Sequence, residues 1–521
     1  MYSSQDEKAL FALSKQLLSG DTGDVATTIA DLRRVINFHE WKYYIQNNPS
    51  ISDFEYDQLY KKLESLEQSH PELVTPDSPT QRVSSDLTED FPTVEHIVPM
   101  LSLDNSYNAE DLVKWDEQVK KLTGEEEIEY VVEPKFDGGS IAIIYEDDQL
   151  ARAATRGNGQ AGEEMTPNAR TIKSLPLHAA FSRHGIHRVE LRGEAVIRKD
   201  RFALLNKERE AEGLPILANA RNSATGALRT KDPQETARRR IEAFVFQMGY
   251  AVDSDGNDKL PDIRDHNSAI EMLSSLGFKV SQAGRRVCKT IDEVHAFCAE
   301  WQEKRDTYPY EIDGMVIKVN DFELQERCGA TSHHPRWAIA FKFRAKQATS
   351  KLVSVEYQIG KIGSVTPVAK IEPVQLAGVT VTSISLHNED FITGKDIRLG
   401  DTVLVERAGD VIPYIVKPIT ELRDGTEQVI DFPRACPACD TPLIRPEGEA
   451  AWRCPNFQCE AQVLQRMIFH ISKDAMDIDG FGYKYVERFY ELGWLRSLAD
   501  FYNLDYDKIA GLEGFGTKSA E

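Results

Sequence analysis

The amino-acid sequence predicts a multidomain α+β protein with a helical N-terminal segment, a mixed core, a small β-barrel, a four-cysteine knuckle and a helical C-terminal end. Three observations predict this class. Apolar residues recur at three- and four-residue steps before residue 70, and short strands and helices are mixed from 130 to about 346. Beyond 346, short alternating runs separated by glycine turns precede four clustered cysteines. A chain of 521 residues suggests three to five domains at ~150 residues each.

The charge of the chain limits how it can bind nucleic acid. Lysine and arginine number 62 and aspartate and glutamate 84, a net charge of −22. Such a surface argues against uniform binding to nucleic acid, so any contact with a phosphate backbone must be local. No stretch of eighteen apolar residues occurs, and residues 1–18 are polar and charged, unlike a secretion signal. We therefore expect a cytoplasmic protein without a membrane-spanning helix.

Two helices are predicted at the N-terminal end. The first follows the helical spacing of Ile29, Leu32, Ile36, His39 and Tyr43. The second begins after Ser52, which forms a capping box with Glu55, and it packs through Leu59, Leu63 and Leu66. Asp53, Tyr56 and Asp57 then share one helical face. These side chains suit a cationic, hydroxyl-rich ligand, although acids are also common in a first turn because the helix dipole favours them.

A linker and a third helix lead into the core. Residues 76–99 contain several prolines and acids, so we expect no regular element there. A helix is predicted over residues 108–122, with Leu112, Trp115, Val119 and Leu122 directed inward.

Lys135 is the candidate nucleophile. It lies in the run Glu133-Pro134-Lys135-Phe136-Asp137-Gly138-Gly139, which we expect to form a turn between two buried strands at Val131-Val132 and Ile141–Tyr145. A neutral lysine amine can attack phosphorus. Glu133 and Asp137 favour the ammonium form, so they must be engaged elsewhere if Lys135 reacts. A hairpin turn with a solvated lysine is the alternative.

Polar clusters recur within the apolar strands of the core: Thr155-Arg156-Gly157, Leu191-Arg192-Gly193-Glu194, residues 313–318 and Phe341-Lys342-Phe343. Charged residues in buried strands are costly unless a ligand or partner pairs them. Four such clusters together with one lysine turn indicate one site for a polyanion.

The cysteine pattern predicts a structural zinc site. Cys436 and Cys439, fourteen intervening residues, and then Cys454 and Cys459 form two knuckles suited to one tetrahedral Zn²⁺. Four thiolates leave no open coordination position, so the metal stabilises a segment too short for a core of its own. A set of free thiols is the alternative.

Short runs beyond residue 346 predict a barrel, followed by two glycine hairpins. The barrel strands are expected near residues 353–355, 365–368, 379–381 and 403–405. The hairpins, at residues 478–482 and 512–516, could bring backbone N–H groups close to phosphate or could simply connect helices.

Taken together, these motifs resemble the bacterial NAD-dependent DNA ligases over essentially the whole chain. The ordered set K-F-D-G at 135, R-G at 156, R-G-E at 192, D-G-M-V-I-K at 313 and F-K-F at 341 is similar to the nucleotidyltransferase motif series. The cysteine cluster and I-S-D-F-E-Y-D at 51 separate this family from ATP-dependent ligases and capping enzymes.

The resemblance implies five domains. They are a helical domain that binds nicotinamide mononucleotide (NMN) over 1–85, an adenylation (nucleotidyltransferase) domain over 86–346, an OB-fold domain over 347–430, a four-cysteine zinc finger over 431–460 and an incomplete helix-hairpin-helix domain over 461–521. Further hairpins and a BRCT domain are expected beyond Glu521.

It also implies a reaction. Lys135 attacks the α-phosphorus of NAD, expels NMN and forms a lysyl-adenylate. The adenylate passes to the 5′-phosphate of a nick in double-stranded DNA, and the 3′-hydroxyl displaces AMP. Expected cofactors are NAD, Mg²⁺ or Mn²⁺, and structural Zn²⁺, in a monomer that serves DNA replication and repair. The helical domain is expected to swing onto the nicotinamide half of NAD.

Site residues are carried over by position from the resemblance. The nicotinamide pocket comprises Tyr43, Asp53, Phe54, Glu55, Tyr56 and Asp57. The adenosine contacts comprise Ser102, Leu103, Glu133, Arg156 and Glu194, and Lys318 and Lys342 face the α-phosphate. Asp137 and Glu194 are candidate metal or hydroxyl partners. Arg221, Arg229 and Arg305 match arginines that touch DNA phosphate or NMN, and Arg407 lies in a DNA-facing loop.

The sequence departs from the family pattern at two positions. Tyr44 stands where the family often has histidine, and Ala220 stands where proline is usual. Two other functions stay open: another lysine nucleotidyltransferase that uses ATP, and a non-catalytic DNA-binding protein.

Overall fold

A computed structural model describes most of the chain. The described residues are 2–19, 23–46, 48–82, 91–217, 219–343, 347–376, 379–408, 412–472, 474–478, 480–513, 515–516 and 520. The side chains of Asp53, Arg407, Ala408 and Ile412 lie outside the description. The chain divides into two compact units, Met1–Arg344 and Ala345–Glu521, and each is described by itself.

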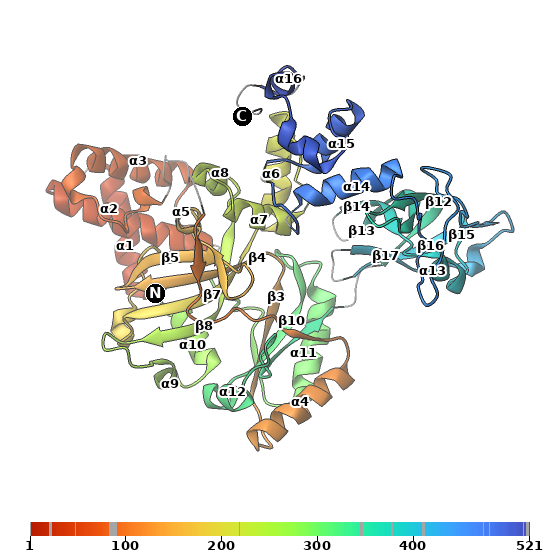
Figure 1. The fold of residues 1–521 in the computed structure, drawn as a ribbon. Helices are drawn as coiled ribbons and strands as arrows, with labels where there is room; N and C mark the ends of the chain where they lie inside the picture. The colour runs from red at the N-terminus through yellow and green to blue at the C-terminus, as the bar shows by residue number, and fades with distance from the viewer. Residues whose placement is uncertain are drawn as a thin grey trace. The chain divides into compact units, whose positions relative to one another are not determined.

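Three helices form the N-terminal part of the first unit (Figure 1). They are α1 (Ser4–Ser19), α2 (Val25–Glu40) and α3 (Asp53–Ser69), and a π-helical turn, Trp41–Ile45, extends α2. Leu32, Ile36, Leu59 and Leu63 are fully buried between them, as their spacing predicts. The capping box predicted at Ser52 is present, because its hydroxyl accepts from the Glu55 amide while the Glu55 carboxylate accepts from the Ser52 amide.

The segment predicted as a linker contains short elements. It includes the 3₁₀ turn Pro79–Gln81 and the strand β1 (Thr93–Glu95), which pairs with β6 (Ala161–Glu163), and the 3₁₀ turn Pro71–Leu73 precedes it. Arg82 is buried there and donates to the carbonyl oxygens of Arg170, Ile172 and Leu175. The segment therefore fastens the helices to the core.

The predicted third helix is α4 (Ala109–Thr123), capped by Asn108. Leu112, Trp115 and Val119 are buried as expected. The prediction was wrong for Leu122, which is 39% exposed although it lies three residues after Val119, because α4 ends one residue later.

Two sheets build the core of the first unit (Figure 1). The first has the order β2-β11-β10-β3-β9, and the second has the order β5-β4-β7-β8. The strands of the first sheet are β2 (Asp104–Ser106), β3 (Tyr130–Phe136), β9 (Arg286–Cys288), β10 (Ile312–Val319) and β11 (Ala338–Lys342). The strands of the second are β4 (Gly139–Glu146), β5 (Gln149–Thr155), β7 (Arg188–Val196) and β8 (Glu242–Val252).

Helices cover one face of each sheet. Helices α4 and α11 pack on Val132, Met315 and Ile317 of the first sheet, and α5, α7 and α10 pack on Ile141 and Ile143 of the second. The helices between the strands are α5 (Thr166–Arg170), α6 (Lys199–Ala211), α7 (Ala220–Leu228), α8 (Pro233–Arg238), α9 (Leu260–Ile263), α10 (His266–Ser275), α11 (Ile291–Lys304) and α12 (Phe322–Cys328), with a 3₁₀ turn at Phe181–His184.

The chain crosses between the sheets next to Lys135. Strand β3 pairs with β9 and β10, whereas β4 pairs with β5 and β7, so β3 and β4 are not a hairpin. Lys135 lies within β3 rather than in a turn, and only Asp137 and Gly138 connect the strands. The turn predicted at Lys135 was wrong, and the alternative of a hairpin fails as well, because each strand finds its partners far along the chain.

The second unit contains the predicted barrel. Its sheet has the order β14-β13-β12-β16-β17, and the edge strands β14 and β17 approach each other. The strands are β12 (Gln347–Ile359), β13 (Val365–Leu376), β14 (Val379–Ser385), β16 (Thr402–Ala408) and β17 (Ile412–Pro418). The 3₁₀ turn Thr420–Leu422 and α13 (Glu389–Gly394) accompany a small sheet of β15 (Arg398–Leu399) and β18 (Gln428–Val429).

Short helices follow the cysteine knuckle: α14 (Glu460–Ile471), α15 (Tyr483–Glu491), a 3₁₀ turn Leu498–Asn503 and α16 (Tyr506–Ala510). Asp479 and Gly514 of the two glycine hairpins lie outside the described residues, so phosphate binding there stays a prediction. Among the described residues, no helix is long and apolar enough to cross a membrane.

Candidate active site and zinc centre

One face of the first sheet carries the charged residues of the candidate site. Glu133 and Lys135 point to the same side of β3 because alternate residues of a strand share a face. Lys135 is paired with Gly314 of β10, which is paired in turn with Lys342 of β11. Lys318 lies four residues after Gly314, so it shares that face. Because side chains alternate along each strand, these charged residues all lie on the sheet face opposite the helix-covered core.

Lys135 and Lys342 meet at Asp313. The Lys135 Nζ lies 3.2 Å from Asp313, and the Lys342 ammonium forms an ion pair with the same carboxylate. The register of β10 shifts between Ile312 and Gly314, a bulge that turns Asp313 toward the lysines. The Lys135 side chain remains 26% exposed, so a ligand can reach its amine.

The two carboxylates that flank Lys135 are engaged by other cations. Glu133 is buried and lies 2.5 Å from Lys318, and Asp137 lies 2.9 Å from Arg221. Burial opposes ionisation of Glu133, but Lys318 and His266 outweigh it and lower the pKa of Glu133 to about 2. Each of the two acids is therefore paired with a cation other than Lys135.

The second sheet contributes Glu194. Its carboxylate accepts from the Ser140 hydroxyl at 2.8 Å and from the Gly138 amide at 3.2 Å. Burial raises the pKa of Glu194 to about 7, although these donors and the charge of Lys135 act in the opposite direction. The residue thus titrates close to neutral pH.

Two of the predicted adenosine contacts, Ser102 and Arg156, lie beside each other. The Arg156 guanidinium donates to the Ser102 hydroxyl at 2.7 Å, and the Ser102 amide donates to the carbonyl of His333. Leu103 follows, half-buried, directly before β2. These residues and Glu194 come from different strands and loops of one core.

Two of the predicted nicotinamide residues, Tyr43 and Tyr56, face cations of the core. The Lys173 Nζ lies 5.1 Å from the ring centre of Tyr56 and 5.4 Å from that of Tyr44. Arg201 donates to the Tyr43 hydroxyl and lies over its ring. Aromatic faces attract cations. Lys173 and Arg201 therefore lie against these rings where a cationic ligand would bind.

The rest of that predicted pocket is oriented differently. Phe54 is 71% exposed, and Asp57 is also exposed. The Glu55 carboxylate serves the capping box and pairs with Lys15. The backbone of Asp53 begins α3, and its side chain lies outside the description.

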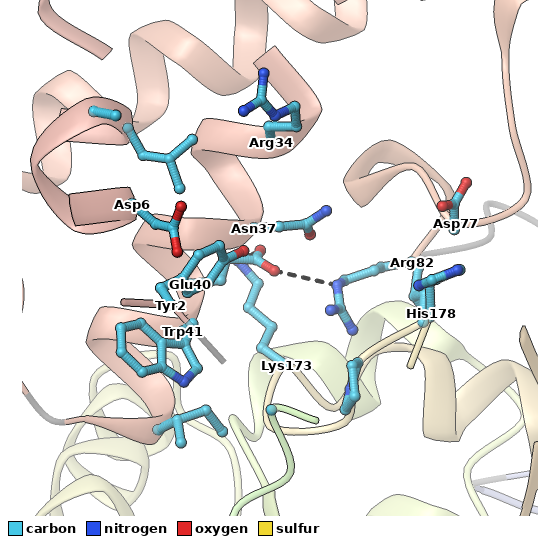
Figure 2. Close-up of a pocket in the computed structure, with 16 residues that line it drawn as sticks. Tyr2, Asp6, Arg34, Asn37, Glu40, Trp41, Asp77, Arg82, Lys173 and His178 are labelled. Atoms are coloured by element: carbon cyan, nitrogen blue, oxygen red, sulfur yellow. Dashed lines mark ion pairs between the residues drawn. The ribbon is translucent and has the colours of Figure 1, made fainter. Parts of the chain in front are cut away.

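A cavity of about 320 Å³ lies where the N-terminal helices meet the core (Figure 2). Glu40 projects into it from α2 and lies 3.3 Å from both Arg82 and Lys173. Burial opposes ionisation of Glu40, but Arg82 and Lys173 lower its pKa. The Tyr56 hydroxyl also donates to Glu40 at 2.7 Å, so one buried carboxylate links the helices to the core.

The candidate DNA-contacting arginines differ in exposure. Arg221 and Arg229 are about half exposed, and Arg229 pairs with Glu163 at 2.7 Å. Arg305 is only 11% exposed and lies over the Phe343 ring, which does not favour a role at DNA phosphate. The Arg407 side chain, with Gly409 and Asp410 of its loop, lies outside the described residues.

The four clustered cysteines fit zinc. Their Sγ atoms lie within 4.8 Å of one another, with Cys436 and Cys459 3.9 Å apart and Cys439 and Cys454 3.5 Å apart. A tetrahedral Zn²⁺ with bonds of ~2.3 Å separates its sulfur ligands by ~3.8 Å, so the described thiols match this geometry.

Three residues at the site had not been assigned from the sequence. Asp313 belongs to the D-G-M-V-I-K motif, so that motif could have identified it. Phe246 offers its carbonyl oxygen to Lys318 at 2.7 Å, and the Nε2 of His266 lies 3.3 Å from the same ammonium. Neither Phe246 nor His266 carries a local sequence signal, because each reaches Lys318 only through the fold.

Comparison with protein families finds four matches along the chain. Residues 22–84 match the N-terminal NAD⁺-binding domain of DNA ligase-like proteins, and residues 88–346 match the adenylation domain of NAD-dependent DNA ligases. Residues 349–427 match the OB-fold domain of those ligases, and residues 435–461 match their C4 zinc finger.

Curated relatives resemble almost the whole chain. A DNA ligase from Persephonella marina is 58% identical over 499 residues, which cover 96% of this chain and 70% of the relative. A DNA ligase from Sulfurihydrogenibium sp. is 54% identical, covering all of this chain and 75% of the relative. One from Aquifex aeolicus is 51% identical, covering 94% of this chain and 67% of the relative.

Proposed function

This chain belongs to the NAD-dependent DNA ligases, which seal nicks in DNA through an adenylate intermediate, and on that premise we propose that Lys135 carries the adenylate. The main support is the arrangement around its amine. Lys135 is accessible, shares a sheet face with Lys318 and Lys342, and has both flanking carboxylates paired with other cations.

The reaction at Lys135 follows from these neighbours. The amine loses a proton, its lone pair attacks the α-phosphorus of NAD, a P–N bond forms, and the P–O bond to NMN breaks. Asp313, 3.2 Å from the Lys135 Nζ, is within hydrogen-bond reach of that proton. Lys342 and Lys318 supply positive charge where negative charge develops on the phosphoryl oxygens.

We propose that the AMP half of NAD binds between the two sheets of the core. Ser102, Leu103 and Arg156 hold the adenosine from one side, with Glu133 and Glu194 opposite. Asp137 and Glu194 offer the carboxylate oxygens that Mg²⁺ prefers, and a bound Mg²⁺ supplies charge that offsets the phosphates.

The nicotinamide half is assigned to Tyr43, Asp53, Tyr56 and Asp57, with Phe54 beside them and Glu55 supporting the first turn of the helix. Tyr43 and Tyr56 contact Arg201 and Lys173 in this structure, so the helical segment must leave these cations to close over NAD. The distance between labels placed near Asp53 and Lys135 tests this closure. If that distance never shortens when NAD is added, the closure is contradicted.

The DNA substrate is assigned to local cationic positions on this acidic chain. We assign phosphate contacts to Arg221, Arg229 and the loop of Arg407, and we expect a monomer to act on nicked duplex DNA. The glycine hairpins of residues 478–482 and 512–516 add contacts that do not depend on base sequence.

Intact-mass spectrometry tests the nucleophile. The protein is first treated with NMN to remove any AMP already attached, and is then incubated with Mg²⁺ and either NAD or ATP. We expect one AMP adduct with NAD only, absent in Lys135→Ala and present in the control Lys207→Ala, whose lysine is exposed on α6.

Each other result has a distinct meaning. An adduct with NAD on Lys135→Ala moves the nucleophile to another residue. An adduct with ATP but not NAD contradicts the cofactor assignment, and no adduct with either favours a protein that only binds DNA.

A further inference from the structure

His266 is a buried histidine that the proposed chemistry does not use directly. It begins α10, is 1% exposed, and lies far from the candidate motifs in sequence. Its Nε2 is 3.3 Å from the Lys318 Nζ and 4.0 Å from a carboxylate oxygen of Glu133. It is therefore in contact with two residues of the adenylation site.

The backbone fixes the position of this ring. The His266 amide donates to the carbonyl oxygen of Asn320 at 2.8 Å, and the Asn267 amide donates to the side-chain oxygen of the same residue at 3.0 Å. Asn320 follows β10 directly, two residues after Lys318. The start of α10 is thus fastened to the strand that carries Lys318.

The contacts of Lys318 define what His266 does. An ammonium group has three N–H donors and no acceptor. Lys318 lies 2.5 Å from Glu133, donates to the Phe246 carbonyl at 2.7 Å, and has His266 as the third partner. Because lysine can only donate, the Nε2 of His266 accepts, and the ring proton resides on Nδ1.

The charges around the ring favour this neutral form. Burial, followed by the positive charge of Lys318, lowers the pKa of His266 to about 4, while Glu133 acts in the opposite direction and Arg285 adds to the lowering. A protonated His266 would carry a donor at Nε2 and repel Lys318. At neutral pH the ring therefore retains its acceptor.

We infer that His266 is a positioning residue of the adenylation reaction, whose Nε2 holds the Lys318 ammonium beside Glu133 and directs it toward the α-phosphate. This inference rests on the proposed role of Lys318. Without the acceptor, one Lys318 N–H is left unpaired in a buried site, and the ammonium shifts to find another partner. A shift of ~1 Å in a group that contacts the reacting centre can cost ~100-fold in rate.

The test compares glutamine with asparagine at position 266. A glutamine amide reaches the place of Nε2, whereas an asparagine amide reaches only the place of Nδ1. We expect His266→Asn and His266→Leu to slow single-turnover adenylation by ~10- to 100-fold at saturating NAD, and His266→Gln to stay within ~3-fold of the parent. The readout is the AMP adduct by intact mass, with KM for NAD measured separately from the rate.

Lys318→Met separates this inference from the proposed function. If Lys318→Met adenylates at the parent rate, the assigned role of Lys318 fails. If it is slow while His266→Asn and His266→Gln react equally fast, the positioning role of His266 is overturned. Urea unfolding of every variant identifies losses that come from folding, and His266→Asn keeps a polar side chain in place if His266→Leu does not fold.

Discussion

Glu194 is an ionisable residue of the site whose pKa is raised close to neutral pH. Burial raises its pKa from 4.5 to about 7, even though Ser140 and the Gly138 amide donate to it. Between pH 4.5 and about pH 7, the Glu194 carboxyl of the folded protein binds a proton that the same group releases in the unfolded chain. Stability therefore falls as the pH rises through this range, which is the sign for a carboxyl whose folded pKa is raised.

Replacing Glu194 by glutamine should remove this loss. We expect the stability of Glu194→Gln relative to the parent to increase from pH 4.5 to pH 7, by at most ~3 kcal/mol given ~1.4 kcal/mol per pKa unit. Urea unfolding of both proteins across this range measures the difference. A difference that stays constant with pH contradicts the buried, protonated carboxyl.

The sequence predicted some site residues and missed others for physical reasons. Lys135 and Lys342, which the structure brings together at Asp313, were proposed from the sequence because their motifs are local and ordered along the chain. Asp313 was not assigned, because simple alternation from Gly314 turns it toward the core and only the bulge in β10 brings it to the lysines. His266 acts through space on Lys318, which no local pattern encodes.

At the scale of elements, the crossing from β3 to β4 depends on Gly138. A Cβ atom on Gly138 would overlap the carbonyl oxygen of Ala195 in β7, with the side chain of Val196 also too close. The backbone of β7 is held by β4 and β8 and cannot move away. The close approach of the two sheets beside Lys135 thus requires glycine at this position.

Gly138→Ala should therefore disrupt the site. We expect a loss of stability of ~2 kcal/mol or more, in the range of overpacked cores, together with slow adenylation. Gly23→Ala is the control, because its Cβ would meet only Thr27, at an ordinary 4.0 Å. Urea unfolding and the AMP adduct measure both effects, and equal stability of the two variants argues against the crowding at Gly138.

The bounds of the helices and strands show which features a local sequence pattern can predict. The capping box at Ser52 and the buried stripes of α2 and α3 were predicted because helix signals are local. The turn predicted at Lys135 was wrong, because strand partners far along the chain decide where β3 ends. Arg82 lies in a segment predicted to be irregular, yet it is buried, because carbonyl groups of the core accept its hydrogen bonds.

At the scale of the whole molecule, the zinc knuckle shares the core of the barrel. Cys436, Cys454 and Cys459 belong to the same buried cluster as Val403 and Ile415. The Cys454 amide donates to the carbonyl of Gly363, at the turn between β12 and β13. Gly363 has φ +82°, and a Cβ there would overlap the Cys454 carbonyl oxygen, so the turn and the knuckle fit closely.

Loss of zinc should destabilise the second unit and leave the first intact. We expect Cys459→Ser, or a zinc-selective chelator with Mg²⁺ present, to lower the Tm of the second unit by roughly 10 °C or more, since ~1 kcal/mol shifts Tm by about 2–4 °C at this size. Adenylation of Lys135 should persist. Calorimetry, zinc content and intact mass measure these effects.

Asp440→Asn is the control for this experiment. Asp440 lies between the ligand Cys439 and Thr441 with φ +55°, a conformation that asparagine tolerates. The Asp440→Asn variant should keep its zinc and the Tm of its second unit. Unfolding of both units together in Cys459→Ser contradicts their separate stability.

The order of the domains was predictable from sequence, but their contacts were not. The cysteine spacing and the motif series follow the chain and so predict which domain comes next. The contacts of Lys173 with Glu40 and Tyr56 join residues more than one hundred positions apart, and no periodic pattern predicts such pairs.

The register of β3, β10 and β11 also determines how the enzyme can vary through evolution. Lys135, Lys318 and Lys342 share one face of the sheet only because the distances between them along and across the strands are fixed. A single-residue insertion or deletion within β10 after the bulge would turn Lys318 toward the apolar side of the sheet. Lineages can therefore exchange side chains around this site, whereas changes of length must accumulate in the loops that join the strands.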